Sequence, residues 1–159
     1  MTVHQGLGIS VEVPRGWEAR ISRATPQPGD HPGESHYPYL HLASFPLPPV
    51  RAHYGGGAVE SMRQDDAFVA VLDFGPDAAH SNLFELRGLP RKLTRAQFSA
   101  RQLQRMLPGQ LGSQQFCTVN GRGIVLYVVL GGAAALRTKV PVLNTILPTI
   151  ALSNEVPSP

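Results

Sequence analysis

The chain has 159 residues, of which 42% are apolar, and a chain of this size and composition can bury one hydrophobic core. No apolar run approaches the roughly 18 residues that a membrane span needs, and residues 1–5 lack the basic start and apolar stretch of a signal peptide. The single cysteine, Cys117, excludes an internal disulfide and a cysteine-cluster metal site. We expect one soluble, cytoplasmic domain over residues 1–153, followed by a short tail over residues 154–159.

Two alternating patterns open the chain. Apolar residues occupy every second position from Leu7 to Val13, which predicts a half-buried strand. A second alternation over residues 17–21 follows the turn sequence at 14–16 and places Trp17 on the core side. Residues 7–21 are therefore predicted to form an antiparallel hairpin.

The middle of the chain alternates apolar runs with segments rich in proline and glycine. Residues 22–36 carry almost no apolar side chains, which indicates a surface loop. The apolar runs over residues 37–45 and 67–74 predict strands, and residues 83–86 predict an edge strand. A short helix is expected over residues 58–65.

Two overlapping helix-start patterns follow, Thr94-x-x-Gln97 and Ser99-x-x-Gln102. The second start would make Phe98 and Leu103 the two partners of a hydrophobic staple. We therefore expect a helix over residues 100–107 that ends at Pro108-Gly109.

The strongest local signal is the dipeptide Asn120-Gly121 between two apolar runs, because these residues favour the positive φ angles of a two-residue hairpin turn. The second strand, Ile124 to Leu130, has no polar face and must be covered on both sides. Helical spacing over residues 142–150 predicts a terminal helix after Pro141. The predicted fold class is α/β (α+β): a mainly antiparallel sheet covered by helices on both faces, a three-layer α/β/α sandwich.

The opening run from Ile9 to Trp17, a strand leading into Pro-x-Gly-Trp, resembles the entry to PsbP-like α/β/α sandwiches. It also looks like small uncharacterised bacterial proteins. The resemblance implies a non-enzymatic module, since members of that superfamily serve as photosystem extrinsic subunits, a nuclear-import GTPase-binding factor and secretion-associated chaperones. No further motif aligns, so no binding residue is carried over from it.

Charge is strongly polarised along the chain. Residues 86–154 hold nine Arg or Lys and no acid, whereas residues 1–85 hold five Arg against ten acids. We interpret residues 87–105 as a basic surface that binds an acidic protein, a nucleic acid or an anionic lipid, and we favour another protein as the partner. Its candidate residues are Arg87, Arg91, Lys92, Arg95, Arg101 and Arg105. The alternative is a fold that brings the two halves together and neutralises its own charge.

Two rival functions compete with this non-enzymatic binding or adaptor module. One is a small-molecule or lipid binder with an apolar pocket beside the 22–57 loops, lined by Tyr37, Tyr39, Phe45 and Tyr54. The other is an enzyme that uses the histidine-rich loop, with His31, Glu34, His36, His41 and His53. No catalytic motif, metal-ligand spacing or cofactor motif is recognised, and nucleic acid is disfavoured because no basic run is interleaved with aromatic residues.

Overall fold

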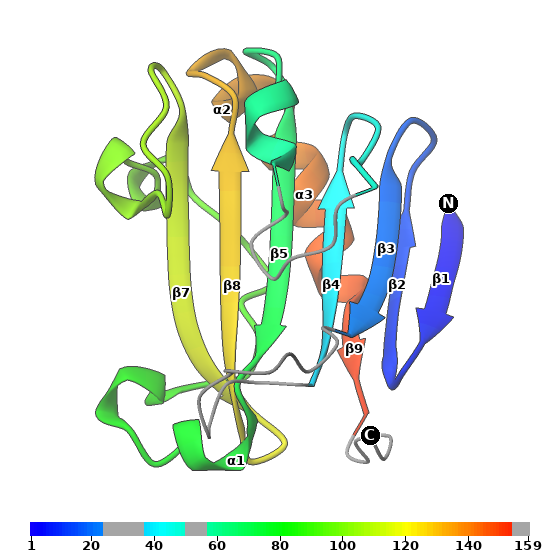
Figure 1. Cartoon of the computed structure of the whole chain (residues 1–159), viewed down its shortest axis with the longest axis vertical. Coiled ribbons are helices and arrows are strands. Elements are labelled where there is room, and N and C mark those ends of the chain that lie inside the picture. The colour runs from blue at the N-terminus through cyan, green and yellow to red at the C-terminus, as the bar shows by residue number, and fades with distance from the viewer. Residues whose placement is uncertain (24–36, 50–56, 154–159) are drawn as a thin grey trace.

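A computed structural model describes residues 1–23, 37–49 and 57–153. Within these residues the chain forms two sheets and short helices (Figure 1). The strands are β1 Thr2–Gly6, β2 Ile9–Val13, β3 Glu18–Arg23, β4 Pro38–Ala43, β5 Ala67–Asp73, β6 Leu86–Arg87, β7 Leu111–Val119, β8 Arg122–Leu130 and β9 Ala151–Leu152. The α-helices are α1 Gly75–Ala78, α2 Ala134–Thr138 and α3 Val140–Ile146. The 3-10 helices are η1 Ala58–Ser61, η2 Asn82–Phe84, η3 Arg95–Gln97, η4 Ala100–Gln102 and η5 Leu147–Thr149.

The larger sheet has the strand order β3-β4-β5-β8-β7-β6, and only its β6–β7 pair is parallel. The smaller sheet has the order β1-β2-β9 and packs through β2 against β3, β4 and α3. Asn120 and Gly121 turn β7 into β8 with φ angles of 52° and 75°, as their residue types predict. All nine residues of β8 are buried, so the prediction of a central strand covered on both faces is confirmed.

Two hydrophobic cores cover the two faces of the larger sheet. The rear core joins the sheet to β2, α3 and η5 through residues such as Val11, Leu126 and Leu143. The front core joins Phe68 and Tyr127 to side chains that come from short 3-10 helices and connecting segments. Figure 1 shows α2 and α3 behind the larger sheet.

The predicted three-layer α/β/α sandwich is therefore wrong. Helices cover the rear face only in part, since β2 shares that face. The described cover of the front face comes from η1, α1, η2, the segment after β4 and the segment after η4. Single large side chains such as Phe84 and Leu103 fill the front core. Proline and glycine between these anchors keep each helical turn short, so no long helix forms there.

The predicted hairpin over residues 7–21 is also wrong, because its two strands belong to different sheets. Strand β2 pairs with β1 and β9, whereas β3 pairs with β4. Leu7 is not a core residue of a strand but a turn residue between β1 and β2, with φ of 49°. The alternation over residues 9–13 is nevertheless confirmed, since Ile9, Val11 and Val13 are buried.

The helix expected over residues 100–107 is replaced by η3 and η4. The first start pattern is used, because Gln97 Oε1 accepts a hydrogen bond from Thr94 N at 2.8 Å. Phe98 packs in the rear core and Leu103 packs against the front core, so these side chains lie on opposite faces of the sheet and form no staple. The terminal helix is confirmed as α3, with Pro141 in its first turn, and it continues into η5.

Candidate functional site

The basic segment, residues 87–105, follows the outer edge of β7. It begins in β6, where Arg87 pairs with Thr118. Further along, Ser99 and Gly112 exchange two backbone hydrogen bonds of 2.9 and 2.8 Å, which form an isolated antiparallel bridge. The segment therefore contacts β7 near both ends of that strand and covers much of an edge that would otherwise expose backbone groups.

Buried side chains fix the segment between these two contacts. Leu93 and Phe98 point into the rear core, and Leu103 packs against the front core. The basic segment therefore crosses the edge of the larger sheet from its rear face to its front face. Burial of these anchors stabilises one backbone path by the ordinary hydrophobic effect.

Polar side chains from other elements bind the backbone of the segment. Asn144 of α3 accepts from Leu93 N at 2.7 Å and donates to Leu93 O at 3.0 Å. The hydroxyl of Tyr127 in β8 accepts from Gln104 N at 2.7 Å. These hydrogen bonds satisfy backbone groups of the segment that have no partner strand. They also hold the segment against α3 and β8.

Gln102 joins the basic segment to β7. Its Oε1 accepts from Gln114 N at 2.9 Å, and its Nε2 donates to Gln97 O at 3.1 Å. The side chain therefore replaces one missing strand partner of β7 and closes a short loop within the segment. In the sequence Gln102 belongs to the second capping pattern, Ser99-x-x-Gln102. That pattern marked Gln102 as a polar residue of interest but did not predict its contact with Gln114.

All six predicted site residues are exposed. Arg87 lies in β6, Arg95 in η3 and Arg101 in η4. Arg91 and Lys92 directly precede the buried Leu93. They form a strip along the β7 edge and not one compact cluster.

Arg105 is paired with Glu60 of η1, with NH1 and Oε1 2.6 Å apart. Both side chains are partly solvated, and such surface pairs contribute little net stability. For the other five basic residues, no ion pair forms with an acid in the described parts of the chain. Within the described parts, an acid of the same chain therefore neutralises only one of the six predicted site residues, Arg105.

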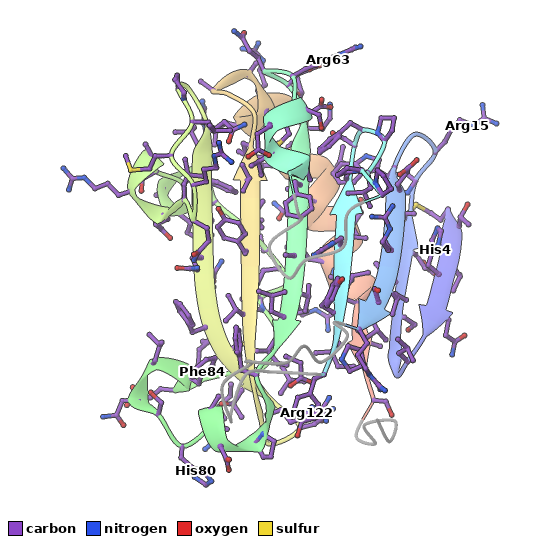
Figure 2. All side chains as sticks on the ribbon, in the orientation of Figure 1. His4, Arg15, Arg63, His80, Phe84 and Arg122 are labelled. Atoms are coloured by element: carbon purple, nitrogen blue, oxygen red, sulfur yellow. The ribbon has the colours of Figure 1, made fainter. Side chains whose placement is uncertain are left out.

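A buried ion pair, which the sequence did not predict, lies at the start of β8. Arg122 Nε donates to Asp73 Oδ2 at 2.8 Å, and the two side chains are only 9% and 11% exposed. Arg122 also donates to Ser153 O at 3.0 Å, and Asp73 Oδ1 accepts from Gly75 N at 2.8 Å. The pair closes one end of the sheet (Figure 2), so Arg122 adds little to the outward basic charge.

The residues of the predicted apolar pocket are largely used elsewhere. Tyr39 and Phe45 are buried in the front core, and Tyr37 packs so closely on Gly75 that an added Cβ would lie 2.7 Å from the Tyr37 ring. Tyr54 lies outside the described residues. A small cleft of about 20 Å³ lies at a different place, beside Leu7, Arg122 and Ser153. The described tyrosines and Phe45 therefore act as packing residues.

The described histidines lie on separate elements. His4 is half-buried on β1, His41 is buried on β4 and His80 is exposed after α1; Figure 2 shows His4 and His80 far apart. His41 packs between Tyr39 and Phe68, with ring centroids 4.6 and 5.3 Å away. His31, Glu34, His36 and His53 lie outside the described residues. Among residues 1–23, 37–49 and 57–153, no group of three His, Cys, Asp or Glu is arranged to hold a metal ion.

Cys117 is fully buried in the rear core. Burial raises the pKa of its thiol from 9.0 to about 11. The thiolate is the reactive form, so a thiol in this position is a poor nucleophile at neutral pH.

No helix in the described ranges is both long and apolar enough to cross a membrane. No protein-family model, curated protein or solved structure matches the chain.

Proposed function

We propose that this chain is a non-enzymatic binding module whose basic segment recognises an acidic segment of another protein. The observation that carries the proposal is the contrast between backbone and side chains in residues 87–105. Side chains from α3, β8 and η4 fix the backbone, while all six cations are exposed and five of them form no ion pair within the described residues. A fixed backbone lowers the entropy lost on binding, which favours a recognition surface.

The types of cation support a carboxylate-bearing partner. Five of the six are arginines, whose planar guanidinium groups can bind a carboxylate through two parallel hydrogen bonds. Residues 86–154 contain no acid. The positive charges of the basic segment therefore attract an acidic partner together, over a Debye length of roughly 8 Å.

A protein fits this surface better than a nucleic acid does. Single strands are bound by basic grooves with aromatic side chains on which bases stack. Within residues 87–105 the one aromatic residue, Phe98, is buried in the rear core. The segment therefore offers charge and hydrogen-bond donors without a stacking surface.

The test uses a fluorescently labelled peptide of about ten glutamates, with binding followed by anisotropy at about 50 and about 200 mM salt. In one variant Arg91→Glu and Arg95→Glu are combined; in a matched control Arg15→Glu and Arg63→Glu are combined. Each pair changes the formal net charge from +3 to −1, since every Arg→Glu change removes two units. Arg15 and Arg63 are exposed and lie at the end of the molecule opposite Arg122 (Figure 2).

We expect the affinity to fall about tenfold or more in the basic-segment variant and less than about threefold in the control. Higher salt should weaken the interaction of the unchanged protein. An equal loss of affinity in both variants would show that binding depends only on net charge, and it would contradict a specific binding surface. Tighter, Arg91- and Arg95-dependent binding of a DNA strand of equal length would contradict a protein partner.

A further inference from the structure

Exposed apolar side chains coincide with the two ends of the basic segment. Six large apolar side chains of the described residues are exposed, and Met1, Val3 and Leu7 belong to the β1 hairpin. The other three are Leu83 and Leu86, which precede Arg87, and Met106, which follows Arg105. Apolar contact surface is therefore added where the basic segment starts and where it stops.

Leu83 in η2 and Leu86 in β6 lie on either side of an anchored aromatic residue. Between them Phe84 is buried and packs edge-to-face on Phe116, with centroids 5.5 Å apart and planes at 88°. Phe84 O accepts from the Thr118 hydroxyl at 2.6 Å, and Figure 2 shows Phe84 at the lower end of β7. Phe84 fixes this part of the chain in place. The leucines on either side of it, Leu83 and Leu86, are 56% and 51% exposed.

The charges around these leucines select the class of partner. Glu85 is exposed between them, and an anionic bilayer would repel it where the leucines insert. A protein can bury the leucines and leave Glu85 at the solvated rim of the contact. Arg87, Arg91 and Lys92 follow directly and require acidic groups beside the apolar contact.

We infer that the partner is an extended acidic segment that also carries a large apolar residue, which packs on Leu83 and Leu86 while its carboxylates meet the basic segment. This inference rests on the proposed function. The β7 contacts of the segment run from Thr118 to Gly112, a span of about 20 Å at the rise of a strand. An extended peptide of about six residues covers that span, so about ten residues also reach the apolar ends.

The test compares two labelled peptides of about ten residues with equal numbers of glutamates. One peptide has leucines at both ends and the other has serines there, so the direction of binding does not matter. We expect the leucine peptide to bind the unchanged protein about tenfold tighter or more, because each buried leucine contributes apolar area. The preference should fall in the variant that combines Leu83→Ser and Leu86→Ser.

The matched control is Val3→Ser, because Val3 is 59% exposed on β1, away from the basic segment. It should keep the preference. Circular dichroism of every variant checks that its fold is retained. If both peptides bind equally and Leu83→Ser/Leu86→Ser has no effect, the apolar contact is wrong and the proposed function stands.

If neither peptide binds, the proposed function and the apolar contact are both wrong. Leucine-dependent binding to phosphatidylserine vesicles, without any preference between the peptides, would overturn the inference in favour of a lipid surface.

Discussion

The side-chain amide of Asn144 makes two hydrogen bonds to the backbone of Leu93, donating to its carbonyl at 3.0 Å and accepting from its N–H at 2.7 Å. These are the bonds that a neighbouring strand would supply, made here by one side chain of α3. The contact ties the terminal helix to the part of the basic segment that holds Arg91 and Lys92.

Asn144→Ala should lower the free energy of unfolding by roughly 1–3 kcal/mol, because it leaves two backbone groups of the buried Leu93 without these partners. Asn144→Asp keeps an acceptor and loses the donor, so it should also destabilise the fold. Urea denaturation measures both changes. The Thr145→Ala variant, next to Asn144 and exposed, is the control, and an equal loss in that variant would contradict the assigned role.

Removing one partner of the buried Arg122–Asp73 pair should destabilise the fold more than removing both partners. Asp73→Ala leaves the guanidinium of Arg122 buried without its carboxylate, and such losses are roughly 3–5 kcal/mol. Combining Asp73→Ala with Arg122→Met removes the unpaired charge, so the double variant should be more stable than the sum of the single changes predicts. A double-mutant cycle from chemical denaturation measures this coupling, and additive effects would contradict it.

The turn at Leu7 should tolerate a better residue. Leu7 has φ of 49°, a left-handed conformation that costs a leucine roughly 1 kcal/mol and suits asparagine. Leu7→Asn should therefore raise the unfolding free energy by about 0.5–1 kcal/mol, seen as a higher melting temperature. Leu7→Val, a β-branched residue at the same φ, should lower it. A less stable Leu7→Asn protein would mean that the side chain of Leu7 contributes more than its backbone costs.

Cys117 predicts a loss of stability at alkaline pH. Burial raises the pKa of the thiol from 9.0 to about 11, so the folded state keeps a proton that the unfolded chain releases. Below pH 9 both states are protonated and the thiol adds no pH dependence. As the pH rises from about 9 to about 11, the unfolding free energy should fall, on the order of 2 kcal/mol.

Cys117→Ala should lack that part of the decline while keeping the contribution of other groups. The measurement is the denaturant midpoint as a function of pH for both proteins. Parallel curves would show that the thiol does not titrate differently in the folded state.

Local signals were sufficient for the centre of the larger sheet. Asn120-Gly121 and the uninterrupted apolar run of β8 specify a turn and a strand with two covered faces, and the structure has both. Apolar runs also predicted β4 and β5. These features depend on neighbours in sequence, which is why pattern and structure agree.

Sheet membership was not predictable in this way. The residues of β1 show no buried alternation, because this strand lies at an edge and is mostly exposed. The pairing of β2 with β9 joins residues near opposite ends of the chain. The sequence of residues 14–17 does not indicate that β2 and β3 join different sheets. Which sheet each strand joins depends on packing throughout the core.

The candidate site divides similarly. The acid-free run predicted the six cations, and all of them are exposed. The residues that hold the segment could not be predicted, since Asn144 binds Leu93 across 51 positions and Tyr127 binds Gln104 across 23. The resemblance to PsbP-like domains stays a prediction, although the helix-covered sandwich that it implied does not occur.

The most direct test of the basic segment as a binding surface is a titration of the ¹⁵N-labelled protein with the acidic peptide, followed by backbone amide shifts. Our account predicts that the largest shifts fall in residues 87–105, with weaker shifts at Leu83 and Leu86, and that the β1–β2 hairpin is unaffected. Shifts concentrated in that hairpin or beside Arg122, with the basic segment unchanged, would contradict it.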